Sequence, residues 1–353
     1  MDLQALLTYD GLTLIWFFLL GVLLTGYAIL DGFDLGVGII HPFVSKGDTE
    51  RRLVMNSIGP LWDGNEVWLV TFGGALFAAF PGAYASVFSG FYLAFMLLLF
   101  ALIFRAVSLE FRSKTESKAW RSVWDYAFFG ASAAAALLFG VAGGNLMAGM
   151  RVDRLGNIDN NIFEQLWHPE VGPYPLLVGI MTVALFAMHG SIYLYLKTEG
   201  ELQKRVHDFI WKTFGFFLVT YILTTMGTLV FVPAAVENFK AAPWLLFVPV
   251  LSVFAIANVP RAIYKKQPGY AFLSSTCTIA AFSFLFATAI FPNFVRASGD
   301  PLMSVDIFSA RSSEMTLKIM LIIAILGIPC VLAYTGAIYW VFRGKVKLDV
   351  TSY

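Results

Sequence analysis

Charged side chains are scarce in this sequence. Asp, Glu, Lys and Arg together make up 13% of its 353 residues, whereas hydrophobic residues make up 58%. A soluble domain carries about 25% charged residues, so the composition is that of an integral membrane protein. The 24 basic and 23 acidic residues nearly balance, and this balance gives no reason to expect binding to nucleic acid.

Cysteine and histidine are scarce as well. Cys277 and Cys330 stand in separate apolar runs, so the sequence has neither a disulfide framework nor zinc-ligand spacing, and no metal site is expected. Histidine is a common axial ligand of haem, but of the four histidines only His189 falls near the middle of an apolar run. We therefore expect no haem held by two histidines of this chain. A histidine–methionine pair stays open, because eleven methionines are available.

Basic residues are absent from the first part of the sequence, where the first one is Lys46. A cleaved signal peptide has a basic region before its apolar stretch, so we expect the first apolar run to remain as a membrane span. The connections between apolar runs leave no room for a soluble domain. We therefore expect a single transmembrane domain over residues 1–353.

Apolar runs of about 20 residues, long enough to cross a bilayer, occur throughout the sequence. They predict an all-α integral membrane protein of about nine transmembrane helices, which would fit two four-helix bundles plus one peripheral helix. Pro60, Pro249 and Pro329 fall inside runs and are expected to kink them. The spans are expected near residues 11–43, 53–80, 84–111, 120–150, 173–196, 208–236, 241–264, 270–295 and 316–342.

Lys and Arg concentrate in alternate connections. Because they collect on the cytoplasmic side of a membrane protein, this pattern predicts an external N-terminus and a cytoplasmic C-terminus. The connections rich in basic residues hold Lys46, Arg51, Arg52, Arg112, Lys114, Lys118, Arg121, Lys197, Lys204, Arg205, Arg261, Lys265, Lys266, Arg343, Lys345 and Lys347. The other connections hold only Arg151, Arg154, Lys240, Arg296 and Arg311.

The second apolar run carries acidic residues. Asp63 and Glu66 are three residues apart and share one helix face, with Trp62 beside them. A carboxylate at the centre of a span costs about 2.5–3.5 kcal/mol and usually faces a partner or a water-filled path. Counted from Arg52, Asp63 would lie about 16 Å into the membrane, with no basic residue expected at its depth. We interpret it as a proton-exchanging group; the alternative is a protonated side chain that hydrogen-bonds a neighbouring helix.

A second set of intramembrane charges falls on the first, third and fourth spans. Asp31 and Asp34, Arg105 and Asp125 are each expected near the same, basic end of their helices. A buried arginine needs acidic partners, since removing one member of a buried pair costs about 3–5 kcal/mol. The set therefore predicts one polar cluster, which either fixes the register of the helices or takes part in the chemistry.

Several motifs closely resemble those of subunit II of the bacterial cytochrome bd-type quinol oxidases. The block WDGNEVWL at residues 62–69 is long and hard to obtain by chance. The likeness is specific over about the first 150 residues and rests on hydropathy, length and scattered residues beyond. The matching segments are LDGFDLGVG (30–38), the run 48–81, FSGFY (88–92), Arg105, FRSK (111–114), WRSVWDY (120–126), GNLMAG (144–149) and the later PNFV and TLK stretches.

The resemblance implies a function that spacing alone does not show. Enzymes of this family, in the bacterial cytoplasmic (inner) membrane, oxidise quinol and reduce oxygen to water without pumping protons. Their haems b558, b595 and d and the substrate quinol site belong to the partner subunit I, and small accessory subunits can be present. Subunit II has nine helices, as two four-helix bundles plus one, supports the haem environment, can hold a quinone, and contributes acids to a cytoplasmic proton route.

Individual residues can be carried over from the family motifs. Asp63 matches the proton-path acid, and Trp62 matches the tryptophan beside it. Glu66 is a weaker match, because the family pattern admits Gln there. Asp34, Arg105 and Asp125 match the family's polar cluster. One departure is the short connection between the sixth and seventh spans, where some members have a much longer one that can contact a quinone.

Two other classes of function fit the residues alone. Intramembrane acids with nearby glycines also suit a proton-coupled transporter, and a purely structural anchor subunit is the third reading. A visible spectrum of the chain purified with its native partners separates the oxidase from the transporter, and removal of Asp63 separates the oxidase from the anchor.

Overall fold

The computed structural model describes residues 8–152, 158 and 161–348, and these residues are mostly helical. The long helices are α2 (Tyr9–Val44), α4 (Trp62–Ala79), α6 (Tyr92–Phe111), α7 (Lys118–Ala148), α9 (Tyr174–Lys197), α10 (Gly200–Phe231), α12 (Phe247–Tyr264), α13 (Pro268–Ile290) and α14 (Glu314–Val341). The shorter helices are α3 (Gly47–Ile58), α5 (Pro81–Gly90), α8 (Ile162–Leu166), α11 (Glu237–Ala241) and the 3₁₀ turns η1 (Arg112–Lys114), η2 (Pro233–Val236), η3 (Pro243–Leu246) and η4 (Pro301–Met303). Two strands, β1 (Asn293–Val295) and β2 (Val305–Asp306), pair antiparallel.

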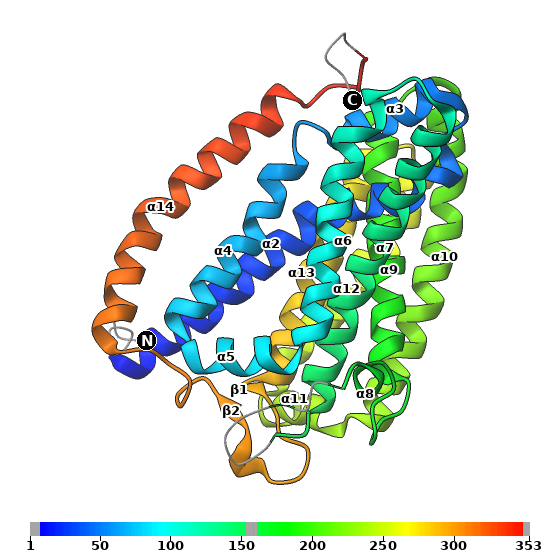
Figure 1. Cartoon of the computed structure of the whole chain (residues 1–353). Coiled ribbons are helices and arrows are strands. Elements are labelled where there is room, and N and C mark those ends of the chain that lie inside the picture. The colour runs from blue at the N-terminus through cyan, green and yellow to red at the C-terminus, as the bar shows by residue number, and fades with distance from the viewer. Residues whose placement is uncertain (1–7, 153–157, 159–160, 349–353) are drawn as a thin grey trace.

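Eight helices of the described chain are long and apolar enough to cross a membrane, namely α2, α6, α7, α9, α10, α12, α13 and α14. α4 runs beside α2 (Figure 1) and spans 18 residues, but Asp63 and Glu66 make it less apolar than the others. Counting α4 as a ninth crossing stays a prediction. The multi-pass membrane protein expected from the sequence is confirmed.

The predicted second span, residues 53–80, is not one helix. α3 and α4 are separated by a turn at residues 59–61, where Pro60 offers no N–H to continue the helix. Arg52 therefore lies on a different helix from Asp63. The depth predicted for Asp63 assumed one continuous helix, and that assumption is wrong, since Asp63 lies in the first turn of α4.

The predicted third span, residues 84–111, is also divided. α5 ends at Gly90 and α6 begins at Tyr92, with Phe91 between them. α5 runs across one end of the molecule rather than through it (Figure 1). Only α6 forms the third crossing, which places Arg105 about 20 Å from its start. The other predicted spans agree with helices of the structure, with boundaries that differ by up to eight residues.

The centre of the molecule is built around α2 and α9, which touch each other through two glycines. A Cβ added to Gly36 would lie 1.9 Å from the carbonyl oxygen of Phe186, and one added to Gly190 would lie 2.4 Å from the carbonyl carbon of Gly36. Two backbones can approach this closely only where side chains are absent. Around this contact, buried residues of α2, α3, α6, α7, α9, α10, α12 and α13 form the main core cluster.

α14 stands apart from the other helices (Figure 1), and only 6% of its most apolar stretch is buried. It is attached at its two ends. Near its start, the indole Nε1 of Trp16 donates to the carbonyl oxygen of Leu317 at 3.0 Å. Near its end, the Lys197 ammonium group donates to the carbonyl oxygen of Phe342. α14 thus fits the predicted peripheral helix, while the grouping of the others into two four-helix bundles stays a prediction.

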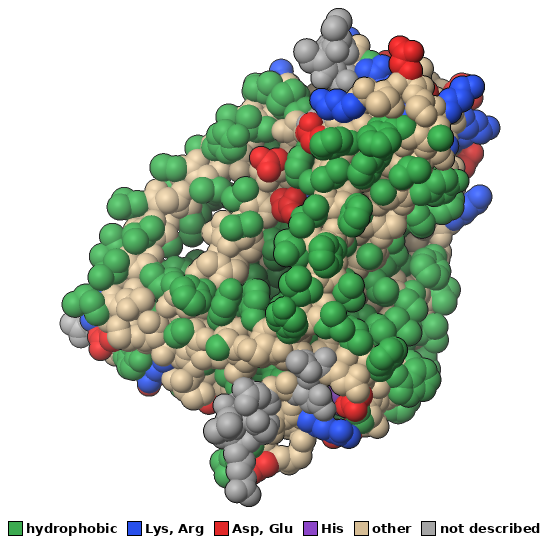
Figure 2. All heavy atoms as spheres, viewed as in Figure 1, with side chains coloured by type: hydrophobic (Ala, Val, Ile, Leu, Met, Phe, Trp, Pro, Cys, Tyr) green, Lys and Arg blue, Asp and Glu red, His purple; other side chains and the backbone are tan. Residues whose placement is uncertain are grey.

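The basic residues of the connections gather where α2, α6, α9, α12 and α14 end, which we call the basic end of the molecule. It includes Lys46, Arg112, Lys197, Lys265 and Lys345. Figure 2 shows Lys and Arg side chains grouped there, beyond a surface of hydrophobic side chains. The described chain thus has the alternation of basic connections that the sequence predicts. The assignment of this end to the cytoplasm stays a prediction.

Candidate functional site

Arg105 of α6 holds two acids from two other helices. Its Nη1 donates to Asp31 Oδ1 of α2 at 2.6 Å, and its Nη2 donates to Glu66 Oε2 of α4 at 3.2 Å. The Arg105 and Asp31 side chains are buried, while that of Glu66 is 23% exposed. Asp31, Glu66 and Arg105, three of the predicted site residues, therefore lie together and join α2, α4 and α6.

Asp34 lies next to this group but contacts an amide instead of the guanidinium group. The side-chain Nδ2 of Asn65 donates to Asp34 Oδ2 at 2.7 Å. The Oδ1 of the same amide accepts a hydrogen bond from the hydroxyl group of Tyr339 at 2.9 Å. Asn65 is therefore a bridge from α2 to α14. We call Asp31, Asp34, Asn65, Glu66, Arg105 and Tyr339 the carboxylate site.

Several buried polar atoms at the carboxylate site have no hydrogen-bond partner among the described residues. They are Asp31 Oδ2, Asp34 Oδ1 and Arg105 Nε, and the Tyr27 hydroxyl group lies beside Asp31. Tyr27 lies one helical turn before Asp31 on α2 and is itself buried. Buried polar atoms are nearly always paired, and in folded proteins ordered water commonly completes such pairs. The site therefore offers water-binding positions beside its acids.

The acids of the carboxylate site outnumber its cationic groups. Asp31, Asp34 and Glu66 supply three carboxyl groups, while among the described residues only the guanidinium group of Arg105 forms ion pairs with them, with Asp31 and Glu66. An uncompensated carboxylate in a medium of low dielectric constant is costly, and such a group neutralises itself by binding a proton. Asp34 is fully buried and has no cationic partner in contact. The arrangement can therefore bind and release a proton.

Asp63 lies apart from the buried acids. Its side chain is exposed at the surface of this chain, and no hydrogen bond or ion pair reaches it from the described residues. Trp62, which precedes it, is half-buried and packs against the main core cluster. Figure 2 shows acidic side chains among hydrophobic ones on the face that includes α4 and α14. Asp63 thus faces outwards from the first turn of α4.

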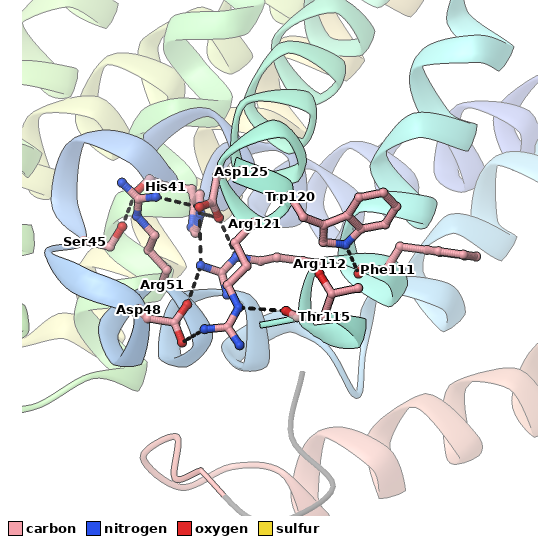
Figure 3. Close-up of polar contacts among 10 residues, drawn as sticks. All are labelled: His41, Ser45, Asp48, Arg51, Phe111, Arg112, Thr115, Trp120, Arg121 and Asp125. Atoms are coloured by element: carbon pink, nitrogen blue, oxygen red, sulfur yellow. Dashed lines mark hydrogen bonds and ion pairs between the residues drawn. The ribbon is translucent and has the colours of Figure 1, made fainter. Parts of the chain in front are cut away.

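Asp125 does not join the carboxylate site, so the prediction of one cluster is wrong. Figure 3 shows Asp125 at the basic end, where it accepts hydrogen bonds from His41 Nε2 at 2.8 Å and from Arg51 Nη1 at 2.6 Å. His41 lies on α2 ten residues after Asp31, or about 15 Å along the helix. The prediction failed because it treated Asp31, 12 residues before the end of its predicted span, as level with Asp125, 5 residues from the end of its own span.

Arg112 extends this second network, which we call the basic-end network. Its Nε donates to Asp125 Oδ1 at 2.6 Å and its Nη2 donates to Asp48 Oδ1 at 2.9 Å. Arg121 Nη1 donates to the other oxygen of Asp48 at 3.0 Å. These contacts join α2, α3, η1 and α7 (Figure 3), so their evident role is to hold α3 in place.

Sequence reasoning missed two members of the carboxylate site. Asn65 stands in the same helical turn as Asp63 and Glu66, so its position in the motif was a usable signal. Tyr339 lies 274 residues from its partner Asn65, and nothing in its local sequence marks it. The basic-end network was also missed, although the basic residues of FRSK and WRSVWDY flank Asp125.

His189 at the centre of the protein and His41 at the basic end have ring nitrogens that bond to protein groups. His189 Nδ1 lies 2.7 Å from Ser275 Oγ, and its Nε2 lies 3.1 Å from the carbonyl oxygen of Ile29. His41 Nε2 is bound to Asp125. Among the described residues, no group of three His, Cys, Asp or Glu side chains could hold a metal ion. These residues do not fit a haem held by two histidines of this chain.

Comparison with known proteins gives concordant results. The family model described as cytochrome bd terminal oxidase subunit II matches residues 12–342. The chain is 35% identical to cytochrome bd-I ubiquinol oxidase subunit 2 of Escherichia coli (strain K12), over 98% of this chain and 97% of that protein. It is 32% identical to cytochrome bd ubiquinol oxidase subunit 2 of Bacillus subtilis (strain 168), over 94% of this chain and 96% of that protein. Its fold is similar to a chain of the bd oxidase from Geobacillus thermodenitrificans, with a TM-score of 0.75 and 15% identity over 94% of this chain and 98% of that chain.

Proposed function

This chain belongs to the cytochrome bd terminal oxidase subunit II family, and we propose that its buried carboxyl groups supply protons for oxygen reduction by the complex. It is a subunit of an oxidoreductase complex, and its family implies a partner, subunit I, and haem cofactors in the complex. Relatives are named ubiquinol oxidases, so the proposed reaction is oxidation of quinol coupled to reduction of oxygen to water. That reduction consumes protons as well as electrons.

One observation carries the proposal, namely the excess of carboxyl groups over cationic groups at the carboxylate site. Arg105 compensates at most part of the charge of Asp31, Asp34 and Glu66. At least one of these acids is therefore more stable with a bound proton, and a neighbouring acid can accept that proton in turn. The polar atoms that lack a partner in the chain provide positions for water between them.

Asp63 is the acid placed to pass protons out of this chain. Exposure of a carboxylate to lipid is costly, and intramembrane acids face protein or water instead. We infer that subunit I covers the face of α4 from which Asp63 projects. Glu66, one turn further along α4 and partly exposed, connects this face with Arg105 and the buried acids. Trp62 matches the family's tryptophan beside the proton-path acid, and it is proposed to lie next to this path.

The haems b558, b595 and d are proposed to reside on subunit I. The engaged nitrogens of His189 support this placement, since they bond to protein groups on both sides of the ring. When bound, the haems supply the electron transfer and oxygen chemistry; the residues of this chain position, hold and move protons. A bound quinone, surrounding lipid and small accessory subunits are further proposed partners. The bacterial cytoplasmic (inner) membrane, with the basic end inside, is the proposed location.

The test uses the purified two-subunit complex with Asp34→Asn or Asp63→Asn. Asparagine keeps the size and hydrogen bonding of aspartate but cannot exchange a proton. We expect quinol-driven oxygen consumption to fall severalfold or more, while the haem absorption spectrum of the same preparation stays nearly unchanged. Glu116→Gln, which removes an exposed acid that has no hydrogen bond or ion pair among the described residues, serves as the control. Parental oxygen consumption in both aspartate variants, with unchanged haem content, would refute the proposal.

The alternative of a proton-coupled transporter is not favoured. It rested on intramembrane acids and glycines, and the family match over residues 12–342 accounts for both within an oxidase subunit. The third reading, a purely structural anchor, is tested by the same Asp63→Asn measurement.

A further inference from the structure

Asn65 of the carboxylate site stands between two groups with different hydrogen-bonding abilities. An ionised carboxylate can only accept hydrogen bonds, whereas a phenol hydroxyl can donate or accept them. Asn65 turns its donor, Nδ2, towards Asp34 and its acceptor, Oδ1, towards Tyr339. The amide group that faces Asp34, either Nδ2 or Oδ1, is therefore linked to whether the Tyr339 hydroxyl group donates a hydrogen bond to Asn65 or accepts one from it.

The orientation of the amide affects the proton on Asp34. With Nδ2 towards the carboxyl group, the hydrogen bond stabilises the charged form of Asp34. With Oδ1 turned towards it, a hydrogen bond forms only if the carboxyl group carries a proton to donate. While Tyr339 donates to Oδ1, the donor side of the amide faces Asp34. A flip would make the hydroxyl oxygen accept from Nδ2 and would take away the present acceptor of the hydroxyl proton, so donation by Tyr339 favours the observed orientation.

Tyr339 is the contribution of α14 to the carboxylate site. Its ring packs edge-on against Phe33 of α2, with ring centroids 6.5 Å apart, so the hydroxyl group is delivered by a side chain that is already anchored. It lies in the last turn of α14, close to the attached end of that helix. The hydroxyl group therefore has a fixed place, unlike a group on the exposed middle of α14.

We propose that Tyr339 is a positioning residue for the proton path: its hydroxyl group fixes the Asn65 amide and thereby sets how readily Asp34 releases a proton. This inference deepens the proposed function and rests on it for its role in oxygen reduction. Other groups act on Asp34 from the helices packed around it, and their contributions stay in place when only the Tyr339 hydroxyl group is removed. They are Asp31 of α2, Glu66 of α4, Arg105 of α6 and Tyr193 of α9.

The experiment compares Tyr339→Phe with Tyr334→Phe in the complete oxidase complex. Both changes remove one hydroxyl group from α14, but Tyr334 is 66% exposed and its hydroxyl group has no hydrogen-bond partner among the described residues. Phenylalanine keeps the ring packing against Phe33, and the haem spectrum verifies assembly. The primary readout is the infrared C=O band of protonated Asp34, recognised by its loss in Asp34→Asn and followed as a function of pH. The secondary readout is oxygen consumption over the same pH range.

We expect the Asp34 band in Tyr339→Phe to persist to a pH about 0.5–1 unit higher than in the parent, the size of effect that one hydrogen bond produces. The pH profile of oxygen consumption should move in the same direction, and Tyr334→Phe should change neither. In an Asn65→Ala background, where no amide is left to position, Tyr339→Phe should have no further effect on the band.

The outcomes separate this inference from the proposed function. An Asp34 band with an unchanged pH dependence in Tyr339→Phe would overturn the positioning role, even if Asp34→Asn abolishes oxygen consumption. An equal shift in the Asn65→Ala background would overturn it as well. A shifted band in Tyr339→Phe together with full oxygen consumption in Asp34→Asn would support the positioning role and refute the proton path through Asp34.

Discussion

Lys197 and Lys345 join the end of α9 to the segment that follows α14, because the ammonium group of each bonds to backbone carbonyl oxygens near the other. The ammonium group of Lys197, at the end of α9, donates to the carbonyl oxygens of Phe342 and Gly344 after α14. The ammonium group of Lys345 donates to the carbonyl oxygens of Leu196 and Thr198 at 2.9 and 2.8 Å. The last carbonyl groups of a helix lack partners within it and favour positive charge. This reciprocal arrangement fastens the free-standing α14 to the core helix α9.

Lys345→Met should loosen the end of α14. Loss of its two hydrogen bonds removes about 1–2 kcal/mol of local stabilisation, so amide hydrogen exchange in the last two turns of α14 should become about tenfold faster. Hydrogen–deuterium exchange of the purified complex, read by mass spectrometry, measures this. Lys347→Met removes the same charge two residues away, where no side-chain contact is present in the described chain, and should leave the exchange rate unchanged. Equal acceleration in both variants would contradict the prediction.

Asp125→Asn should destabilise the basic end of the molecule. The carboxylate of Asp125 compensates Arg112, which is buried, and also accepts from His41 and Arg51. Removal of one partner of a buried charge pair costs about 3–5 kcal/mol when the other charge is left alone, and here Arg112 would keep only the exposed Asp48 as an acidic partner, so we expect the lower end of this range. The melting temperature and the yield of intact complex should both fall. Glu116→Gln removes an exposed acid nearby and provides the control; a melting temperature as low as that of Asp125→Asn would show that net charge, not the network, is responsible.

Gly36→Ala should prevent the close approach of α2 and α9. The added methyl group would lie 1.9 Å from the carbonyl oxygen of Phe186, which is backbone and cannot turn away. Gly21→Ala on the same helix meets no atom within 4 Å and should be neutral or stabilise the helix by up to about 1 kcal/mol. Detergent-solubilised yield and melting temperature measure the difference. Similar values for the two variants would show that the contact can relax.

Arg105→Ala should reduce assembly far more than Asp63→Asn does. Arg105 is buried and its removal strands Asp31 without a cationic partner in contact, at a cost of about 3–5 kcal/mol. Asp63 is exposed in this chain and keeps its shape as asparagine, so its loss should affect turnover rather than assembly. Comparing the yield of haem-containing complex from the two variants checks this, and equal yields would count against the structural role of Arg105.

The membrane spans could be predicted from the sequence because each depends only on a local run of apolar residues. The turns at residues 59–61 and at Phe91 could not be placed with the same precision. Pro60 indicated a kink, but a kinked helix and a break leave the same signal in the sequence. The consequence was large for Asp63, since its expected depth depended on an unbroken helix.

The sequence shows which charged residues fall inside the predicted spans, but which of them pair with one another was harder to predict. The prediction converted residue number into membrane depth. This conversion is valid only for a helix that runs perpendicular to the plane of the membrane. α2 has 36 residues and is about 54 Å long, and it crosses the molecule obliquely (Figure 1). Residues equally far from a predicted helix end therefore lie at different levels, and Asp125 separates from Arg105. The contact of Tyr339 with Asn65 depends on the folding of the whole chain.

The break before α4 has a consequence for the surrounding lipid. α4 spans 18 residues, or about 27 Å, and its uninterrupted apolar part begins only at Val67, which leaves roughly 20 Å. The hydrocarbon layer of a bilayer is about 30 Å thick, so α4 is too short to match it. A short span is accommodated by local thinning of the bilayer or by contact with other protein. If α4 crosses the bilayer, the acyl chains beside it either compress, which brings headgroup water closer to Asp63, or give way to the partner subunit.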